Sequence, residues 1–158
     1  MTTRARDLME TSLVTLAADE PVSEIERVFA EEEIHGAPVV DDQGRLMGMV
    51  STLDLVRAAV RDKETNRETP SEFEEIFDVA RGEWNRFMEV YRERVKSLVA
   101  EDVMTEGAIS VEMDAEVPEI ARTMREARTH RVVVVEDGAV RGIISSFDLL
   151  AVLEKSSV

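Results

Sequence analysis

Two stretches decide the fold of this chain: Gly48-Met49-Val50-Ser51-Thr52-Leu53-Asp54 and Gly142-Ile143-Ile144-Ser145-Ser146-Phe147-Asp148. Each begins with a glycine, continues through an apolar run and a serine, and ends on an aspartate three residues after the serine. An apolar run that gives way to this spacing predicts a buried strand that turns directly into a helix. The chain therefore contains one strand-to-helix junction twice.

The repetition extends toward the N-terminal side of both stretches. The two histidines of the chain, His35 and His130, hold the same slot at a spacing of 95 residues. The other recurring residues are Ala5, Asp7, Met9, Asp19, Val22, Glu24, Ile25, Arg27 and Glu31, which return as Ala100, Asp102, Met104, Asp114, Val117, Glu119, Ile120, Arg122 and Glu126. A fixed period predicts two copies of one unit. We expect these copies to pack about a pseudo-twofold axis and to form two equivalent clefts.

Hydrophobic periodicity predicts an α+β fold with the order β-α-β-β-α in each repeat. In the first repeat we expect strands at 13–16, 37–40 and 46–51 and helices from Val22 and at 53–60. In the second we expect strands at 109–111, 132–136 and 140–145 and helices at 117–126 and 147–153. Asp137-Gly138, between two β-branched runs, is typical of a two-residue hairpin turn. Its counterpart at 41–44 is one residue longer, which accounts for a one-residue slip in the repeat.

An insertion separates the repeats, so the expected organisation is repeat 1 at 1–60, the insertion at 61–99 and repeat 2 at 100–158. Thr69-Pro70-Ser71-Glu72 has the spacing of a capping box. After it, apolar residues recur at spacings of four and three, which predicts one long amphipathic helix over 70–99. The apolar residues are Phe73, Phe77, Ala80, Trp84, Phe87, Tyr91, Val95 and Leu98. This stripe either packs on its own module or offers a partner or dimer surface.

Charge and composition exclude several classes of function. The chain has 34 acidic and 19 basic residues and a net charge of −15, which disfavours nucleic acid and anionic membranes. It has no cysteine, so thiolate nucleophiles and zinc–thiolate sites are excluded. There is no apolar leader and no apolar stretch long enough for a membrane span, which favours a cytoplasmic protein. The sequence also has no Gly-rich phosphate loop, no His-Glu-x-x-His and no Ser/His/Asp set, so we do not expect an enzyme.

Three motifs, in order and twice over, resemble a tandem pair of CBS (cystathionine-β-synthase) domains, also called a Bateman module. The first pair is Asp7-Leu8-Met9 and Asp102-Val103-Met104. The second pair spans 35–41 and 130–136, and the third is the pair of junctions quoted above. The resemblance implies a regulatory or sensor module that binds adenosine compounds in the clefts between repeats. It also implies a homodimer and a protein partner.

The junction residues are the main candidates for ligand binding: Ser51, Thr52 and Asp54 in the first repeat, and Ser145, Ser146 and Asp148 in the second. A carboxylate there can accept both hydroxyls of a ribose, and hydroxyls with free helix N–H groups can meet a phosphate. The resemblance implies these roles. The alternative is purely structural, since serine with an acidic residue three later is also a helix cap.

His35, His130 and Arg131 are candidates for phosphate binding, as the resemblance implies. Arginine can hold a phosphate through two hydrogen bonds. The first repeat has Gly36 where the second has Arg131, so we expect unequal sites, with the phosphate held in the second repeat. The alternative is that each histidine bridges backbone groups at a strand end. The two histidines lie in different repeats, so no metal site is expected.

The resemblance also implies that Pro38 and Val132 flank an adenine ring, although both residues equally fit plain core strands. These observations lead to one hypothesis: a sensor for AMP or ADP, or for a triphosphate bridged by Mg²⁺, without an obligatory cofactor. The alternative is a ligand-free dimeric scaffold that uses the helix at 70–99.

Overall fold

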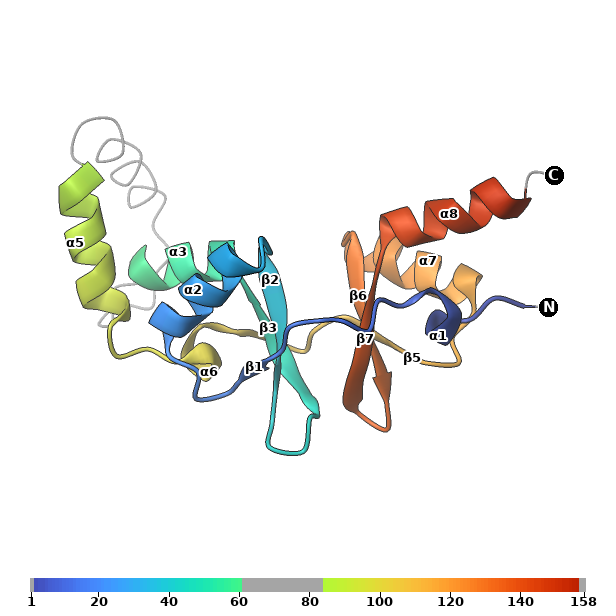
Figure 1. The fold of residues 1–158 in the computed structure, drawn as a ribbon, viewed down its shortest axis with the longest axis horizontal. Helices are drawn as coiled ribbons and strands as arrows, with labels where there is room; N and C mark the ends of the chain where they lie inside the picture. The colour runs from blue at the N-terminus through green and yellow to red at the C-terminus, as the bar shows by residue number, and fades with distance from the viewer. Residues whose placement is uncertain (1, 61–83, 157–158) are drawn as a thin grey trace. The chain divides into compact units, whose positions relative to one another are not determined.

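The computed structural model describes residues 2–60 and 84–156 (Figure 1), and its helices and strands follow the predicted β-α-β-β-α order in both repeats. In chain order they are α1 (Ala5–Leu8), β1 (Leu16–Ala17), α2 (Val22–Glu31), β2 (Gly36–Val40), β3 (Leu46–Ser51), α3 (Thr52–Val60), α5 (Trp84–Val95), α6 (Ala100–Val103), β4 (Thr105–Glu106), β5 (Ser110–Glu112), α7 (Val117–Ala127), β6 (Arg131–Glu136), β7 (Ala139–Ser145) and α8 (Ser146–Ser156). None of the described helices is both long enough and apolar enough to cross a membrane.

The chain divides into two compact units. Unit 1 comprises Met1–Ala17, Ala37–Met49 and Glu106–Val158, and unit 2 comprises Ala18–Gly36 and Val50–Thr105. Unit 1 thus contains β5, α7, β6, β7 and α8 of the second repeat, together with the N-terminal segment and residues 37–49 of the first repeat. Unit 2 contains the helices α2, α3, α5 and α6.

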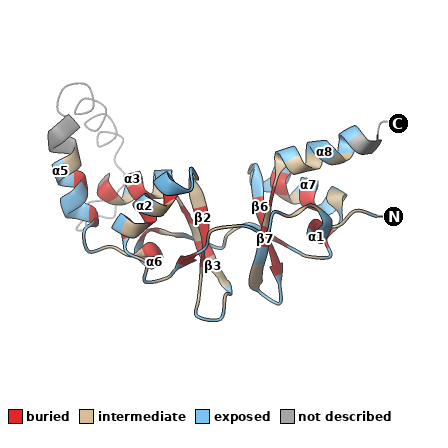
Figure 2. Cartoon of the chain, in the orientation of Figure 1, coloured by how far each residue is buried: buried red, intermediate tan, exposed pale blue. Residues whose placement is uncertain are grey.

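In unit 1, β5, β6 and β7 form a sheet in that order. β5 is parallel to β6, with Val111 opposite Val134, and β6 is antiparallel to β7, with Val132 opposite Ile144. Asp137 and Gly138 both have positive φ, 51° and 81°, as the predicted two-residue turn requires. Residues 132–135 of β6 are all buried, as Figure 2 shows in red. Such a strand stabilises the unit by about 1.5 kcal/mol or more for each valine removed from water.

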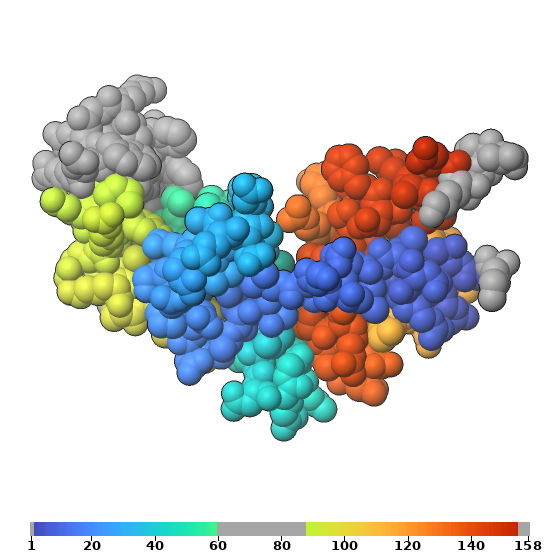
Figure 3. Space-filling model, viewed as in Figure 1, coloured from blue at the N-terminus to red at the C-terminus, as the bar shows by residue number. Residues whose placement is uncertain are grey.

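The start of the chain packs on the second repeat within unit 1. Ala5 N donates to Ala115 O at 2.8 Å, and Glu10 exchanges two backbone hydrogen bonds with Ile143 at 2.9 and 3.0 Å. Figure 3 shows the dark blue N-terminal atoms against the orange and red atoms of this repeat. A Cβ added at Gly142 would lie 2.7 Å from Glu10 O, so a glycine is required where the two segments cross.

The corresponding segment of the second repeat packs in unit 2. Ala100 N donates to Glu20 O at 2.9 Å, and Glu101 N donates to Ala18 O at 2.9 Å. Each segment begins with a short helix capped by a recurring aspartate. Arg4 N donates to Asp7 Oδ2 at 2.9 Å, and Val99 N donates to Asp102 Oδ2 at 3.0 Å. These aspartates recur because each begins a helix, α1 or α6.

The described part of the insertion packs on its own unit. Tyr91 and Val95 of α5 are buried, Tyr91 Oη donates to Glu26 Oε1, and Arg94 Nη1 donates to Ala59 O at 2.6 Å. The pKa of Tyr91 is raised well above its ordinary value. Burial is the largest cause, followed by the hydrogen bond to Glu26 and the negative charge of Glu26. For these residues the structure confirms packing on the module.

Several predicted boundaries differ from the observed ones; α8, for example, runs to Ser156 instead of ending at residue 153. The helix of the insertion ends at Val95 instead of reaching residue 99, because Val99 N is hydrogen-bonded to Asp102 at the start of α6. The insertion at 61–83, which includes the predicted loop, the capping box at 69–72 and the start of the predicted helix, lies outside the described residues. The opening strands begin later than predicted, at Leu16 and at Ser110 instead of residues 13 and 109, because the ladders with β2 and β6 start there.

Candidate functional site

The first strand-to-helix junction is a reciprocal hydrogen-bonded loop. Ser51 N and Ser51 Oγ both donate to Asp54 Oδ2 at 2.7 Å, and Asp54 N donates back to Ser51 Oγ at 3.3 Å. Both side chains are half-buried at the start of α3. The structure confirms the capping interpretation of this motif.

The second junction shares the two hydrogen bonds to the aspartate. Ser145 N and Ser145 Oγ donate to Asp148 Oδ2 at 2.7 Å each. The cap uses only one oxygen of each carboxylate. Asp54 Oδ1 accepts a long hydrogen bond of 3.3 Å from Thr105 Oγ1, whereas no described residue donates to Asp148 Oδ1. Each aspartate can therefore cap its helix and still offer an oxygen to a ligand, so the two predicted roles are compatible.

The structure brings each histidine to its junction through the backbone. Thr52 N donates to His35 O at 2.9 Å, and Ser146 N donates to His130 O at 2.9 Å. Both imidazoles are exposed, and the hydrogen bonds that tie these residues to the junctions use the carbonyl oxygens. The carbonyl oxygen of each histidine thus joins the start of a β-strand to the first residue of the following helix, and a contact of either imidazole with a phosphate stays a prediction.

The two repeats differ at the next position for a steric reason. Gly36 begins β2, and a Cβ at this position would lie 3.1 Å from Val50 O. A side chain there would force the neighbouring strand to move, so the first repeat has little room for an arginine. Arg131 in the second repeat is exposed at the start of β6. The guanidinium can therefore turn toward a ligand in one repeat only.

Pro38 and Val132 are buried, with less than 2 % of their surface exposed. Val132 belongs to the core cluster of unit 1, together with Val134, Ile144 and Ile120. This placement agrees with the alternative that both are core residues. Any contact with an adenine ring stays a prediction.

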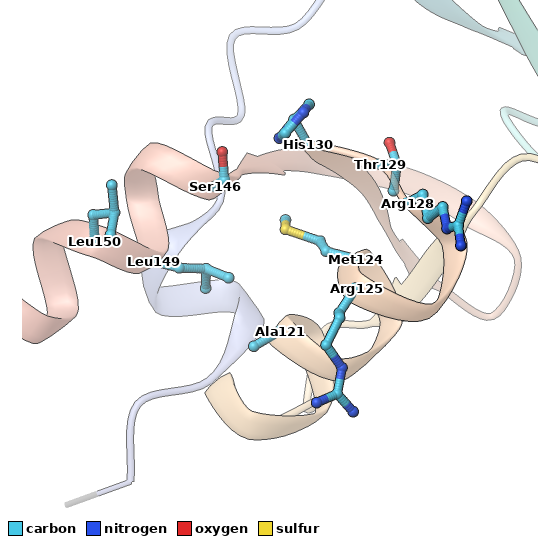
Figure 4. Close-up of a pocket in the computed structure, with 9 residues that line it drawn as sticks. All are labelled: Ala121, Met124, Arg125, Arg128, Thr129, His130, Ser146, Leu149 and Leu150. Atoms are coloured by element: carbon cyan, nitrogen blue, oxygen red, sulfur yellow. The ribbon is translucent and has the colours of Figure 1, made fainter.

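A cavity of about 520 Å³ opens beside the second junction, between α7 and α8 (Figure 4). In Figure 4, Met124 and Leu149 point toward one another in the centre, and Arg125 and Arg128 lie at the rim. The lining residues are Ala121, Met124, Arg125, Arg128, Thr129, His130, Ser146, Leu149 and Leu150. The cavity therefore contains two predicted site residues, His130 and Ser146.

The other lining residues were not predicted from the sequence, although two of them differ in charge from their counterparts in the first repeat. Arg125 and Arg128 occupy positions where the first repeat has Ala30 and Glu33. The repeat is broken at these points, and a change from neutral or acidic to basic residues could have identified the rim. The hydrogen bond between Thr105 and Asp54 was also not predicted, because Thr105 does not recur: the first repeat has Glu10 at the corresponding position.

Among residues 2–60 and 84–156, no group of three or more histidine, aspartate or glutamate side chains is placed to hold a metal ion. The groups at the junctions are of kinds that can bind hydroxyls and anions. Each offers a carboxylate oxygen, hydroxyl groups, an imidazole and, in the second repeat, a guanidinium.

Comparisons with known proteins identify the repeats. The sequence model of the CBS domain matches residues 5–61 and 99–155. The uncharacterized protein MJ1426 of Methanocaldococcus jannaschii is 30 % identical over 152 residues, which cover 94 % of this chain and 89 % of that protein. The chain also matches two longer proteins of the same organism, spanning 42 % and 31 % of their lengths.

Solved structures share the fold. The CBS domain of a membrane protein from Sphaerobacter thermophilus superposes with a TM-score of 0.70 at 27 % identity, covering 95 % of this chain and 87 % of the other. The structure of CBSX2 in complex with AMP has a TM-score of 0.68 at 21 % identity and covers 98 % of each chain.

Proposed function

This chain belongs to the CBS domain family, and we propose that it is a regulatory module that binds an adenosine nucleotide at its strand-to-helix junctions. The carrying observation is a pair of matching junctions, in which Ser51 and Ser145 each donate to Oδ2 of the aspartate three residues later. In both, Oδ2 caps the helix, while Oδ1 is held by one long hydrogen bond or by none from a described residue. A carboxylate oxygen at a helix N-terminus, beside hydroxyls, suits a ribose attached to a phosphate.

The second repeat is the better site for the phosphate. It provides Arg131 and His130, whereas the first repeat has Gly36 at the position of Arg131, where a Cβ would lie 3.1 Å from Val50 O. The net charge of −15 opposes a bare triphosphate, although screening over about 8 Å leaves the local donors in control. We therefore favour AMP or ADP, or a triphosphate bridged by Mg²⁺, with no obligatory cofactor. The complex of CBSX2 with AMP supports this class of ligand.

A module that binds a nucleotide without transforming it affects the cell only through another molecule. The proposal therefore includes a protein partner that responds to nucleotide binding, and a homodimer, in keeping with the family resemblance. It does not include catalysis. The described part of the insertion helix buries Tyr91 and Val95 in its own unit, so it does not favour a separate scaffold function.

The ribose assignment is tested by titration calorimetry with AMP and with 2′,3′-dideoxy-AMP. If Asp148 accepts the ribose hydroxyls, the dideoxy compound should bind about tenfold more weakly, because each lost hydrogen bond contributes about 0.5–1.5 kcal/mol. Uridine monophosphate is the control for the base. Equal affinity for AMP and the dideoxy compound would contradict the ribose assignment.

A further inference from the structure

Thr129 joins the end of α7 to the strand that carries Arg131. The helix ends in a left-handed turn at Arg128, whose φ is 51°, and Thr129 N donates to Met124 O at 3.0 Å. This is the hydrogen bond of a Schellman motif, which closes a helix and sets the direction of the chain that leaves it. The backbone of Thr129 is therefore held at a defined place between α7 and β6.

The hydroxyl group of Thr129 bonds to both backbone polar groups of Arg131. Thr129 Oγ1 accepts from Arg131 N at 3.3 Å and donates to Arg131 O at 3.0 Å. The ladders of the described strands do not use these two groups. Arg131 follows the bonded pair of Ser146 N and His130 O, so alternation along the antiparallel ladder places it at a non-hydrogen-bonded position. On the other side, β5 pairs with β6 only from Val133 onward. The hydroxyl therefore takes the place of a strand partner at the start of β6.

The first repeat has the same turn without this bridge. The residue that corresponds to Thr129 is Ile34, and Ile34 N makes the same helix-closing hydrogen bond, to Phe29 O at 3.0 Å. An isoleucine side chain offers neither a donor nor an acceptor. Two residues later the first repeat has Gly36, where the second has Arg131. The hydroxyl and the arginine thus occur together in the second repeat and are both replaced in the first.

We propose that Thr129 is a positioning residue for the phosphate of the bound nucleotide and acts through Arg131. An arginine loses conformational entropy when it grips a phosphate, and the loss is smaller when its backbone is already fixed before the ligand arrives. Figure 4 shows the side chains of Thr129, His130 and Ser146 pointing to the same side of the chain. The inference rests on the proposed function, because it names the residue that helps the second repeat to distinguish a nucleotide from a nucleoside.

Calorimetry of the full chain with AMP and with adenosine separates the phosphate from the rest of the ligand. The native chain should bind AMP more tightly than adenosine. Thr129→Val removes the hydroxyl and keeps the shape of the side chain, so it should weaken AMP about fivefold and change adenosine by less than about twofold. Thr129→Ser retains the hydroxyl and should restore the affinity for AMP. Thr123→Val is the matched control, because Thr123 is a half-buried threonine of α7 without a proposed role, and it should leave both affinities unchanged.

A variant of the arginine separates positioning from a purely structural role. If Thr129 acts through Arg131, adding Thr129→Val to the Arg131→Ala protein should not weaken AMP further, because the side chain that it positions is gone. If Thr129 only stabilises the end of α7, its loss should weaken AMP and adenosine alike and should do so with or without the arginine. Urea unfolding of each variant identifies a temperature at which all of them are folded.

The results distinguish this inference from the function on which it rests. A preference for AMP that survives Thr129→Val, or equal losses for AMP and adenosine, would overturn the role of Thr129 and leave nucleotide binding intact. A native chain that binds adenosine as tightly as AMP would also overturn it, since no phosphate contact would remain to be positioned. A native chain that binds neither compound would contradict the proposed function itself, and the role of Thr129 with it.

Discussion

Replacing Asp148 by alanine should affect stability and nucleotide affinity separately, and both effects can be estimated. In the folded chain, Oδ2 accepts the N–H and Oγ–H of Ser145 at 2.7 Å each, at the start of α8. Losing a cap of this kind costs about 1 kcal/mol, and losing the negative charge at the helix N-terminus costs about 0.5 kcal/mol more. For a chain of this length we expect Tm to fall by roughly 3–6 °C.

The loss of affinity has a different origin. If Asp148 accepts ribose hydroxyls, Asp148→Ala removes about 1–3 kcal/mol of binding free energy, and the Kd for AMP rises by roughly 5–150-fold. Asp102→Ala is the matched control. Asp102 caps α6 by accepting from Val99 N at 3.0 Å, but it has no proposed ligand role. It should cost comparable stability and leave the Kd unchanged.

The assay is titration calorimetry with AMP at a temperature where all three proteins are folded, together with urea unfolding of each. If Asp148→Ala and Asp102→Ala bind AMP with the same Kd within about twofold, the carboxylate of Asp148 is only a helix cap. The reasoning that gives it a second role would then be refuted.

Three further predictions concern other positions. Gly142→Ala should lower the free energy of unfolding by about 2 kcal/mol, because its Cβ would lie 2.7 Å from Glu10 O; a loss below about 0.5 kcal/mol in urea unfolding would contradict this close crossing. Tyr91 is the single tyrosine, and its raised pKa means that the folded chain holds the phenol proton more tightly than the unfolded chain. The stability that Tyr91 contributes should therefore be fully present below about pH 10 and should be lost as the pH rises above it, and Tyr91→Phe should remove this pH dependence. An absorbance titration of the tyrosine in the folded protein with a midpoint near pH 10 would be inconsistent with its burial. Arg131→Gly, which copies Gly36 of the first repeat, should weaken AMP but not adenosine in calorimetry, and equal losses for both would rule out a phosphate contact.

Much of the fold was predictable because local chemistry and periodicity agree. The strand at 46–51 was predicted with its observed bounds, since the turn at Gly44 and the cap at Ser51 mark its two ends. The hairpin at Asp137-Gly138 was predictable because only a few residue types adopt two successive positive φ angles.

The period did not predict which repeat the first segment of each repeat packs against. A repeat indicates that Ala5 and Ala100 occupy equivalent environments, but not that Ala5 bonds to Ala115 and Ala100 to Glu20. Packing of each segment on its own repeat or on the other repeat would bury the same residues in equivalent ways. Only the long-range backbone hydrogen bonds distinguish these two arrangements. The short helices α1 and α6 were missed for a related reason, since their aspartate caps belong to segments of four residues without periodicity.

At the candidate site, sequence could identify the residues but not their roles. Serine and aspartate at a spacing of three are equally typical of a cap and of a ribose contact, and the structure shows the cap directly. The arginines at the rim of the cavity were not predicted, because the first repeat has no basic residues at the corresponding positions. Arg125 and Arg128 carry information because they interrupt the repeat.

Thermal unfolding of the native chain against AMP, ADP, ATP with and without Mg²⁺, and S-adenosylmethionine tests the adenosine-nucleotide proposal most directly. A ligand at a hundred times its Kd stabilises the folded state by about 2.7 kcal/mol, which raises Tm by roughly 5–10 °C at this chain length. We expect such a rise with AMP, ADP or Mg²⁺-ATP and a smaller one with ATP alone. Unchanged Tm across the whole panel, on folded protein shown to be free of bound nucleotide, would contradict the proposal.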